Sequence, residues 1–296
     1  MGYAISREYL KNNLKPVIED WKHTIYLWRK TPMAMAGFII FVAFVVTAVF
    51  APALAPYDPN AQDLKNQLQP PSVKNFLGTD QYGRDIFSRV IMGTRVEFQI
   101  ICIVSFISVT IGVIIGLLAG YFGRSVDEVA MRITDMFMAF PQLILAMAFT
   151  SAFGANLTNT ILAISLVDWT TYARLVRAES RKIKTLPYIE AIRAVGASNS
   201  RIMVFHVLPM CLSPVIVQMS LRAGTIVLTA AGLGFLGLGA QPPTPEWGIM
   251  VSEGRSYLVQ QWWISTFSGL AIAAIVFGLN LLGDGIRDII DPRIRR

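Results

Sequence analysis

The sequence is poor in cysteine, histidine and charge. Its two cysteines, Cys102 and Cys211, both lie inside apolar stretches, and its two histidines are far apart. A disulfide scaffold and a zinc or haem site are therefore not expected. Charged residues make up 15% of the chain, against about 25% in soluble domains, which argues against an ordinary cytosolic enzyme. The chain has no G-x-x-x-x-G-K-[ST] phosphate-binding loop, so we expect no ATP, cofactor or metal site within it.

In place of charge, the chain has long apolar runs. Four runs contain no charged residue and a fifth contains only Arg222. A bilayer core needs about 20 apolar residues in helical form, and each run is long enough. The run 136–167 has a turn-like centre at 154–159, so we expect it to end one helix and begin another. The sequence predicts an all-α multi-pass membrane protein with six transmembrane helices, at about 33–56, 98–122, 129–153, 157–175, 210–240 and 262–283.

Basic residues are distributed unevenly between the two sides of this predicted topology. Six spans place 19 of the 26 lysines and arginines on one side and 6 on the other. By the positive-inside rule the richer side is cytoplasmic, and both termini lie there. The net charge of +7 then needs no nucleic-acid partner to explain it. The predicted organisation is a cytoplasmic segment at 1–32, a first span and extracytoplasmic loop at 33–96, a core at 97–290 and a tail at 284–296.

Residues 1–32 are not expected to be a cleaved signal peptide, because a mostly polar stretch precedes the first apolar run. Their apolar side chains recur at helical spacing with lysines between them, which predicts an amphipathic helix. Two alternatives remain for it. It lies on the membrane surface, or it packs against the protein's own helices.

The cytoplasmic connection 170–206 has the pattern of two short helices. Pro187 and Gly196 bracket the first, as proline at a helix start and glycine past its end predict. Ser198 is placed to cap a second helix, which we expect to end before Pro209. Two short helices of this kind form a compact projection that suits insertion into a groove on a soluble partner. Its apolar anchor would be Tyr188, Ile189 and Ile192, and its charged contacts would be Glu190 and Arg193. The alternative is a solvated connector.

The same loop resembles the EAA motif of ABC importer permeases, E-A-A-x3-G-x9-I-x-L-P. From Glu190 to Pro209 it reads E-A-I-x3-G-x9-H-x-L-P, so Ile192 replaces the second alanine and His206 replaces the isoleucine. Three further segments are similar to the C-type permeases of dipeptide, oligopeptide and nickel importers. They are FLGTDQYGRDIFSRV at 76–90, GFLGLGAQPPTPEWG at 234–248 and GDGIRDIIDPR at 283–293.

This resemblance implies a type I ABC importer permease fold in a prokaryotic plasma membrane, with di- or oligopeptides as cargo. It implies four kinds of partner: a B-type permease, two ATP-binding subunits that hold ATP and Mg, an extracytoplasmic substrate-binding protein, and membrane lipid. In that family the loop, here 176–209, contains the coupling helix that docks onto the ATP-binding subunit. The docking residues carried over are Tyr188, Ile189, Glu190, Ala191, Ile192, Arg193 and Gly196.

Charged residues elsewhere have two interpretations. Asp80, Arg84, Asp85 and Arg89 recur near helical spacing outside the membrane, either as a surface for the binding protein or as a solvated helix with an Asp85–Arg89 pair. Arg222 either lines the translocation path or pairs with an acceptor such as Asp168, which we place near a span end with Asp135.

Small and aromatic residues add three expectations. Gly112, Gly116 and Gly120 predict a close helix–helix contact, within the chain or between subunits. The pattern G-x-G-x-x-G at 232–237 lies in a span and follows no strand, so it is not a dinucleotide site. Three tryptophans fit an interfacial belt: Trp247, Trp262 and Trp263.

More than one function remains open within and outside this class. The same importer class also carries nickel, glutathione or oligosaccharides. An ion-coupled secondary transporter is the alternative from a different class, and it would need paired acidic groups in mid-membrane, which the sequence does not suggest.

Overall fold

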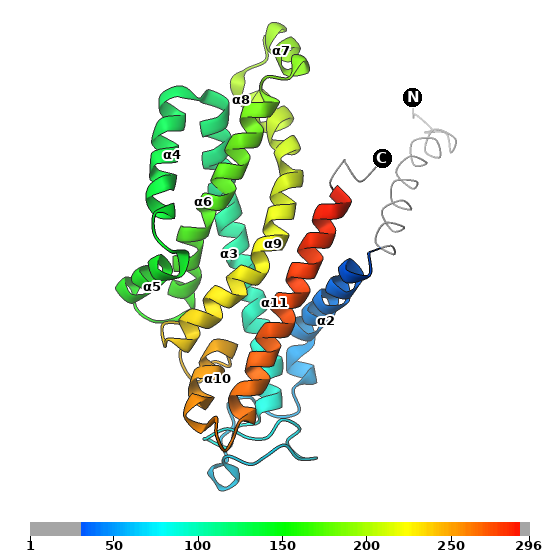
Figure 1. Cartoon of the computed structure of the whole chain (residues 1–296), viewed down its shortest axis with the longest axis vertical. Coiled ribbons are helices and arrows are strands. Elements are labelled where there is room, and N and C mark those ends of the chain that lie inside the picture. Colours follow the sequence, from blue (N-terminus) through cyan, green and yellow to red (C-terminus); the bar gives the residue numbers. More distant parts are fainter. Residues whose placement is uncertain (1–30, 291–296) are drawn as a thin grey trace, which may run out of the picture.

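A computed structural model describes residues 31–290, and all of its regular elements are helices. The longest helices run side by side along the long axis of the molecule, with α7 at one end and α10 at the other (Figure 1). We call these the α7 end and the α10 end. The main helices are α2 (Pro32–Leu54), α3 (Ile86–Phe122), α4 (Arg124–Met138), α5 (Gln142–Phe153), α6 (Leu157–Ile183), α7 (Pro187–Ala194), α8 (Asn199–Ile202), α9 (Leu208–Phe235), α10 (Trp247–Gly254) and α11 (Trp263–Ile290). Residues 1–30, which are most of the predicted amphipathic segment 1–32, lie outside the described residues. The tail from residue 291 lies outside them as well.

The expected all-helical, multi-pass architecture is confirmed, but the span count by length and hydropathy is lower than six. Within residues 31–290, four helical stretches are long and apolar enough to cross a membrane, and the bent pair α4–α5 raises the number to five. The remaining long helix, α6, is 27 residues long but carries Asp168, Arg174 and Arg177, which reduce its hydropathy.

The expected helix 129–153 is wrong in shape. The structure has two helices here, α4 and α5, bent by 88° at a short break. Pro141 lies at the break, and proline disfavours helical conformation in the preceding residue and cannot donate a backbone hydrogen bond. The predicted turn after α5 is present: Gly154 adopts a positive φ, and Asn156 caps α6 by accepting from the Asn159 amide at 2.8 Å.

The glycine stripe of α3 packs against α6 of the same chain. A Cβ added at Gly112 would lie 2.6 Å from the Trp169 carbonyl oxygen, and one at Gly116 would lie 2.5 Å from that of Ala173. Gly120 meets the Arg177 carbonyl in the same way. Only glycine allows this backbone approach, so the stripe is an intrachain contact.

The second short helix expected in the connection 170–206 does not end before Pro209. Ser198 caps α8 as expected, but the helix continues through a π-helical turn, Met203–Val207, into α9. A proline ring clashes with the carbonyl four residues earlier, here Phe205, and the wider π turn at that residue gives the ring room. Pro209 therefore lies inside one long helix and does not stop it.

At the α10 end, two of the three expected interfacial tryptophans are buried. Trp247 donates from Nε1 to the Val90 carbonyl at 3.0 Å, and Trp263 donates to that of Thr79 at 3.3 Å. Trp262 alone of the three is exposed, at 49%. Trp247 and Trp263 thus hold α10 and α11 to α3 and the preceding loop.

Candidate functional sites: an exposed helix and buried ion networks

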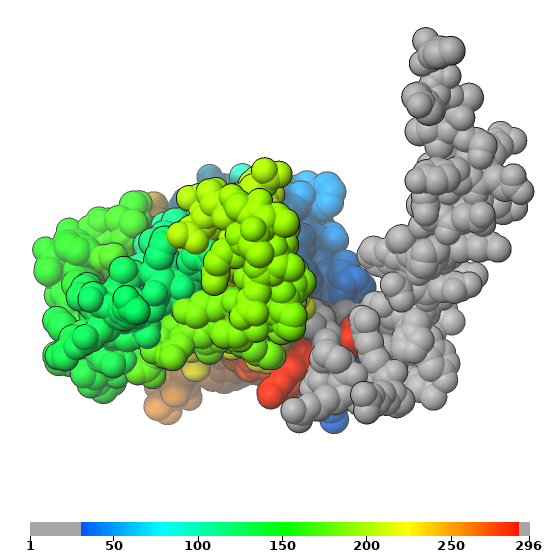
Figure 2. Space-filling model, turned by 90° about the horizontal axis from the view of Figure 1, so that it is seen from above, coloured from blue at the N-terminus to red at the C-terminus, as the bar shows by residue number. Residues whose placement is uncertain are grey.

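Helix α7 protrudes at one end of the molecule, as the sequence predicts. Figure 2 looks onto this end, where the yellow-green segment around α7 lies nearest the viewer. Pro187 occupies the first turn, and Gly196 lies just past the end with φ of +87°. The Gly196 amide donates to the Arg193 carbonyl at 3.0 Å, and the Ala197 amide to that of Ile192 at 3.3 Å, which satisfies two terminal carbonyls.

The side chains of α7 divide into an anchored face and a free face. Ile189 is fully buried among Ile183, Ile202 and Val207, and Ile192 packs against the same cluster. The expected apolar docking anchor is therefore wrong for Ile189, which holds α7 to its own chain. The free face is exposed and consists of Tyr188, Glu190, Ala191, Arg193, Val195 and Gly196.

Polar contacts tie α7 to α9 and tie the residues on either side of α7 to α3. The Tyr188 hydroxyl donates to the Met210 sulfur at 2.9 Å, and Lys184 Nζ donates to the Tyr121 carbonyl at 3.0 Å. Burial lowers the pKa of Lys184. The Tyr121 hydroxyl in turn donates to Asn199 Oδ1 at 2.9 Å. Both apolar and polar contacts therefore hold the base of α7 against the rest of the chain.

Arg222 is paired with Asp168, the acceptor that the sequence suggests for it. Arg222 Nε donates to Asp168 Oδ1 at 2.9 Å, its Nη2 also contacts that oxygen, and Nη2 donates to Gln142 Oε1 at 2.8 Å. Gln142 Nε2 completes the triangle by donating to Asp168 Oδ1 at 3.1 Å. The triangle therefore connects three helices, α9 through Arg222, α6 through Asp168 and α5 through its first residue, Gln142.

The expected position of Asp168 near a helix end is wrong, because it lies in the middle of α6 and is fully buried. Its Oδ2 and the Tyr172 hydroxyl, one turn later, are buried without a hydrogen-bond partner in the described chain. Asp135, by contrast, is exposed and pairs with Arg174 at 2.5 Å.

The four charged residues expected on the outer surface are buried instead. Asp80, Arg84, Asp85 and Arg89 are 1–4% exposed, so the expected solvated helix is wrong. Arg84 bridges Asp80 Oδ2 at 2.5 Å and Glu253 Oε2 at 2.9 Å. Asp85 pairs not with Arg89 but with the start of α3, where its Oδ2 accepts from the Ser88 amide at 2.8 Å.

Arg89 extends this network across the α10 end. Its guanidinium lies 3.8 Å from Asp80 and 3.7 Å from Glu253, and it donates to the Pro59 carbonyl at 3.1 Å. The network connects the loop 55–85 to α3 and α10. Sequence spacing could not show this, because Arg84 and Glu253 are 169 residues apart.

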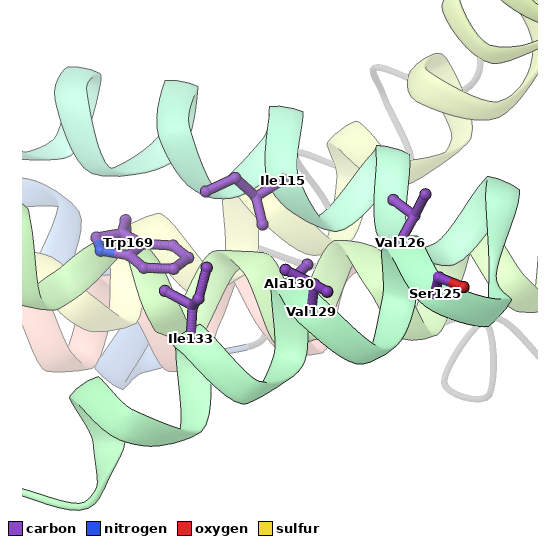
Figure 3. A pocket seen from close by; sticks show the side chains of 7 residues that line it. All are labelled: Ile115, Ser125, Val126, Val129, Ala130, Ile133 and Trp169. Carbon is purple, nitrogen blue, oxygen red and sulfur yellow. The ribbon is translucent and has the colours of Figure 1, made fainter.

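Two hollows flank α4 and differ in chemistry. The first, about 480 Å³, is lined by Ile115 of α3, Trp169 of α6 and an almost entirely apolar face of α4 (Figure 3). The second, about 410 Å³, is lined by Met131, Asp135, Arg174 and Arg177. The first hollow therefore offers apolar contacts to a ligand and the second offers charged ones.

Comparison with known proteins assigns the chain to a family. A family model described as the inner membrane component of binding-protein-dependent transport systems matches residues 112–296. A model of the N-terminal transmembrane domain of oligopeptide transport permease C matches residues 21–71. The fold resembles a crystal structure of an amino acid ABC transporter with histidines, with TM-score 0.50 and 16% identity over 71% of this chain and 94% of that chain.

Curated relatives extend over nearly the whole chain. The dipeptide transport system permease protein DppC of Alkalihalophilus pseudofirmus is 40% identical, with 94% of this chain and 91% of the relative covered. The probable D,D-dipeptide transport system permease protein of Escherichia coli is 41% identical, with 91% of this chain and 90% of the relative covered. The glutathione permease GsiD of Pectobacterium atrosepticum is 39% identical over 95% of both chains.

The chain is therefore a non-catalytic, multi-pass permease subunit of an ABC importer. It belongs to the family of inner membrane components of binding-protein-dependent transport systems, in its OppC-type branch. Membership of this family excludes the ion-coupled secondary transporter. It also implies partner proteins that hydrolyse ATP and bind substrate.

Proposed function

We propose that this permease imports di- or oligopeptides, with glutathione as the closely related alternative. The named cargoes of its relatives, dipeptides, D,D-dipeptides and glutathione, all have an amide backbone and terminal charges. Nickel and oligosaccharides have no support among these names. A binding assay of the cognate binding protein with peptides, glutathione, nickel and sugars tests the cargo.

In the proposed assembly, the chain crosses the membrane six times in a type I importer fold. The α7 end and both termini face the cytoplasm, and the membrane is a prokaryotic plasma membrane. Counting α6 and the bent pair α4–α5 together with the four long apolar stretches gives the six crossings of this topology. A B-type permease completes the pore, two ATP-binding subunits hold ATP and Mg, and a binding protein delivers cargo at the α10 end.

The observation that carries the proposal is the exposed face of α7 on an anchored base. Docking of an ATP-binding subunit onto Tyr188, Glu190, Ala191, Arg193 and Gly196 would pass its movement to α3 and α9 through the buried Ile189. ATP favours one arrangement of the ATP-binding subunits, and this differential affinity shifts the permease between inward and outward access.

Charge reversal on the free face tests this docking. Glu190→Lys leaves the α7 anchor intact because the Glu190 side chain is exposed, unlike a deletion of the whole helix, which would also remove Ile189 from the core. We expect the variant to insert normally but to lose copurification of the ATP-binding subunits. Glu128→Lys, on the exposed side of α4, is the matched control. Equal copurification of both variants with wild type would contradict the proposal.

For Arg222 we propose that the Asp168–Arg222–Gln142 triangle lies beside the translocation path. Arg222 keeps 18% of its side chain accessible while Asp168 neutralises it. A cargo carboxylate would compete with Asp168 for this guanidinium. Peptide uptake by Arg222→Gln, compared at saturating and limiting peptide, separates a cargo contact from a purely structural role.

At the α10 end, the binding protein would meet exposed loop residues rather than the four buried charges. Asp80, Arg84, Asp85 and Arg89 would act by holding the shape of this surface. The variant Val73→Glu tests this contact, because Val73 is exposed and lies outside the buried ion network of Arg84 and Arg89. We expect it to lose association with the binding protein.

A further inference from the structure

A pair of buried carboxyl groups lies where α3, α9 and α10 meet. Glu97 of α3 is 0% exposed, and Glu246, directly before α10, is 1% exposed. Gly93, one turn before Glu97 on α3, packs directly against the Trp247 indole, which places the Glu97 side chain beside Glu246. Gly234 of α9 closes the site, since any side chain there would collide with the Glu246 carboxylate. Sequence reasoning misses this pair, because Glu97 and Glu246 are far apart in the chain.

The two carboxyl groups have different surroundings. Glu246 caps α10, with Oε1 accepting from the Gly248 amide at 2.6 Å and Oε2 from the Ile249 amide at 2.9 Å. Neither oxygen of Glu97 makes a hydrogen bond within the described chain, and its one neighbouring donor is the Trp247 amide, too poorly placed to form one. Backbone amides favour the ionised form of Glu246 over that of Glu97.

No cation compensates the pair among the charged groups of the described helices that surround it. On α3, Arg89 belongs to the Asp80–Glu253 network and Arg95 is exposed. On α10, Glu253 is held by Arg84, and on α9 Arg222 is held by Asp168. Two buried carboxylates without a counter-ion cannot both be ionised at low cost.

We propose that Glu97 and Glu246 bind one proton between them, and that this shared proton holds α10 against α3 at the α10 end. The proton comes from water and resides on Glu97, whose hydroxyl donates to the Glu246 carboxylate. Binding it reduces the charge of the pair from two negative charges to one. Loss of the proton places two like charges in contact beneath Trp247, whose indole otherwise ties α10 to α3.

The sign of the pH dependence follows from proton counting. Burial raises the pKa of Glu246, while the amides of Gly248 and Ile249 act in the opposite direction. An unfolded glutamate releases its proton near pH 4.3. Above that pH the folded chain binds more protons than the unfolded chain, so its free energy of unfolding falls as pH rises until the pair itself loses its proton.

The test uses the full chain in lipid nanodiscs, with the midpoint of thermal unfolding measured from mildly acidic to alkaline pH. The decisive variant is Glu97→Gln, because an amide donates to Glu246 as a protonated carboxyl does but cannot release the proton. We expect its unfolding midpoint to equal or exceed that of wild type. We also expect that, as the pH is raised into the alkaline range, this midpoint does not show the fall that the shared proton causes in wild type. Glu128→Gln, at an exposed glutamate, is expected to keep the full alkaline fall.

Infrared spectroscopy supplies a readout that a merely structural role would not change. Wild type and Glu128→Gln are expected to show the carbonyl stretch of a protonated carboxylic acid at neutral pH, and Glu97→Gln is expected to lack it. An unchanged band in Glu97→Gln, or an alkaline fall parallel to wild type, would overturn the proposal. A midpoint that responds to added calcium or magnesium and not to pH would also overturn it, since the pair would then hold a cation in place of the proton.

Discussion

At the scale of single residues, the core of this permease depends on charges that compensate one another. Asp168 is buried in α6 and Arg222 is largely buried in α9, and each would be costly in an apolar interior alone. Together with Gln142 they form a hydrogen-bonded triangle that is centred on Asp168 Oδ1. The pair therefore fixes the relative positions of three helices.

Removing one member of this pair should be more harmful than removing both. We expect Asp168→Asn to lower the free energy of unfolding by about 3–5 kcal/mol, because it leaves Arg222 as an uncompensated charge. The double variant Asp168→Asn with Arg222→Gln should recover much of that loss. Denaturant unfolding of the purified chain measures both. A double variant less stable than Asp168→Asn would show that the charges are not coupled.

The residue scale is also where sequence reasoning was weakest. An Arg222–Asp168 pair could be named as an alternative, since an intramembrane arginine needs an acceptor. The outer charges were assigned to solvent because charged runs usually face water. Their burial depends on Glu253 and on carbonyls of Pro59 and Pro243, partners that only the folded chain brings together.

At the scale of helices, glycine sets the close contact between α3 and α6. We expect Gly116→Ala to destabilise the chain by about 1–3 kcal/mol, because the added methyl group meets the Ala173 carbonyl. Gly269→Ala in α11 is the matched control, since nothing lies within 4 Å of its added Cβ. Its better helix propensity should leave stability unchanged or slightly raised. Thermal unfolding of the two variants measures this difference in stability. An equal loss of stability in both variants would contradict the packing argument.

Helix positions were largely predictable from the sequence, and helix shapes were not. Apolar runs and local caps located α2, α7 and the turn before α6, because hydropathy, proline and glycine act locally. Helix α3 begins at Ile86, 12 residues before the predicted span at 98, because the charged residues before 98 were interpreted separately, as a binding-protein surface or a solvated helix outside the membrane. Proline is present at both the 88° bend before α5 and the π turn before Pro209, but its position alone gives neither the bend angle nor the continuation of the helix.

At the scale of the whole molecule, the two ends are built differently. The α10 end is closed by buried ion pairs, two tryptophan donors and the Glu97–Glu246 pair. The α7 end presents a short helix whose inner face is anchored and whose outer face is free (Figures 1 and 2). This difference suits a subunit that receives cargo at one end and mechanical work at the other.

Site-specific cross-linking distinguishes the two ends by the partner that each one meets. In a background with Cys102 and Cys211 replaced by serine and alanine, a single cysteine is introduced as Ala191→Cys on α7 or as Val73→Cys at the α10 end, both exposed. After coexpression with the partner subunits, we expect the α7 cysteine to cross-link to an ATP-binding subunit and the cysteine at position 73 not to do so. Cross-linking of the ATP-binding subunit from position 73, or of the binding protein from position 191, would contradict the proposed roles of the two ends.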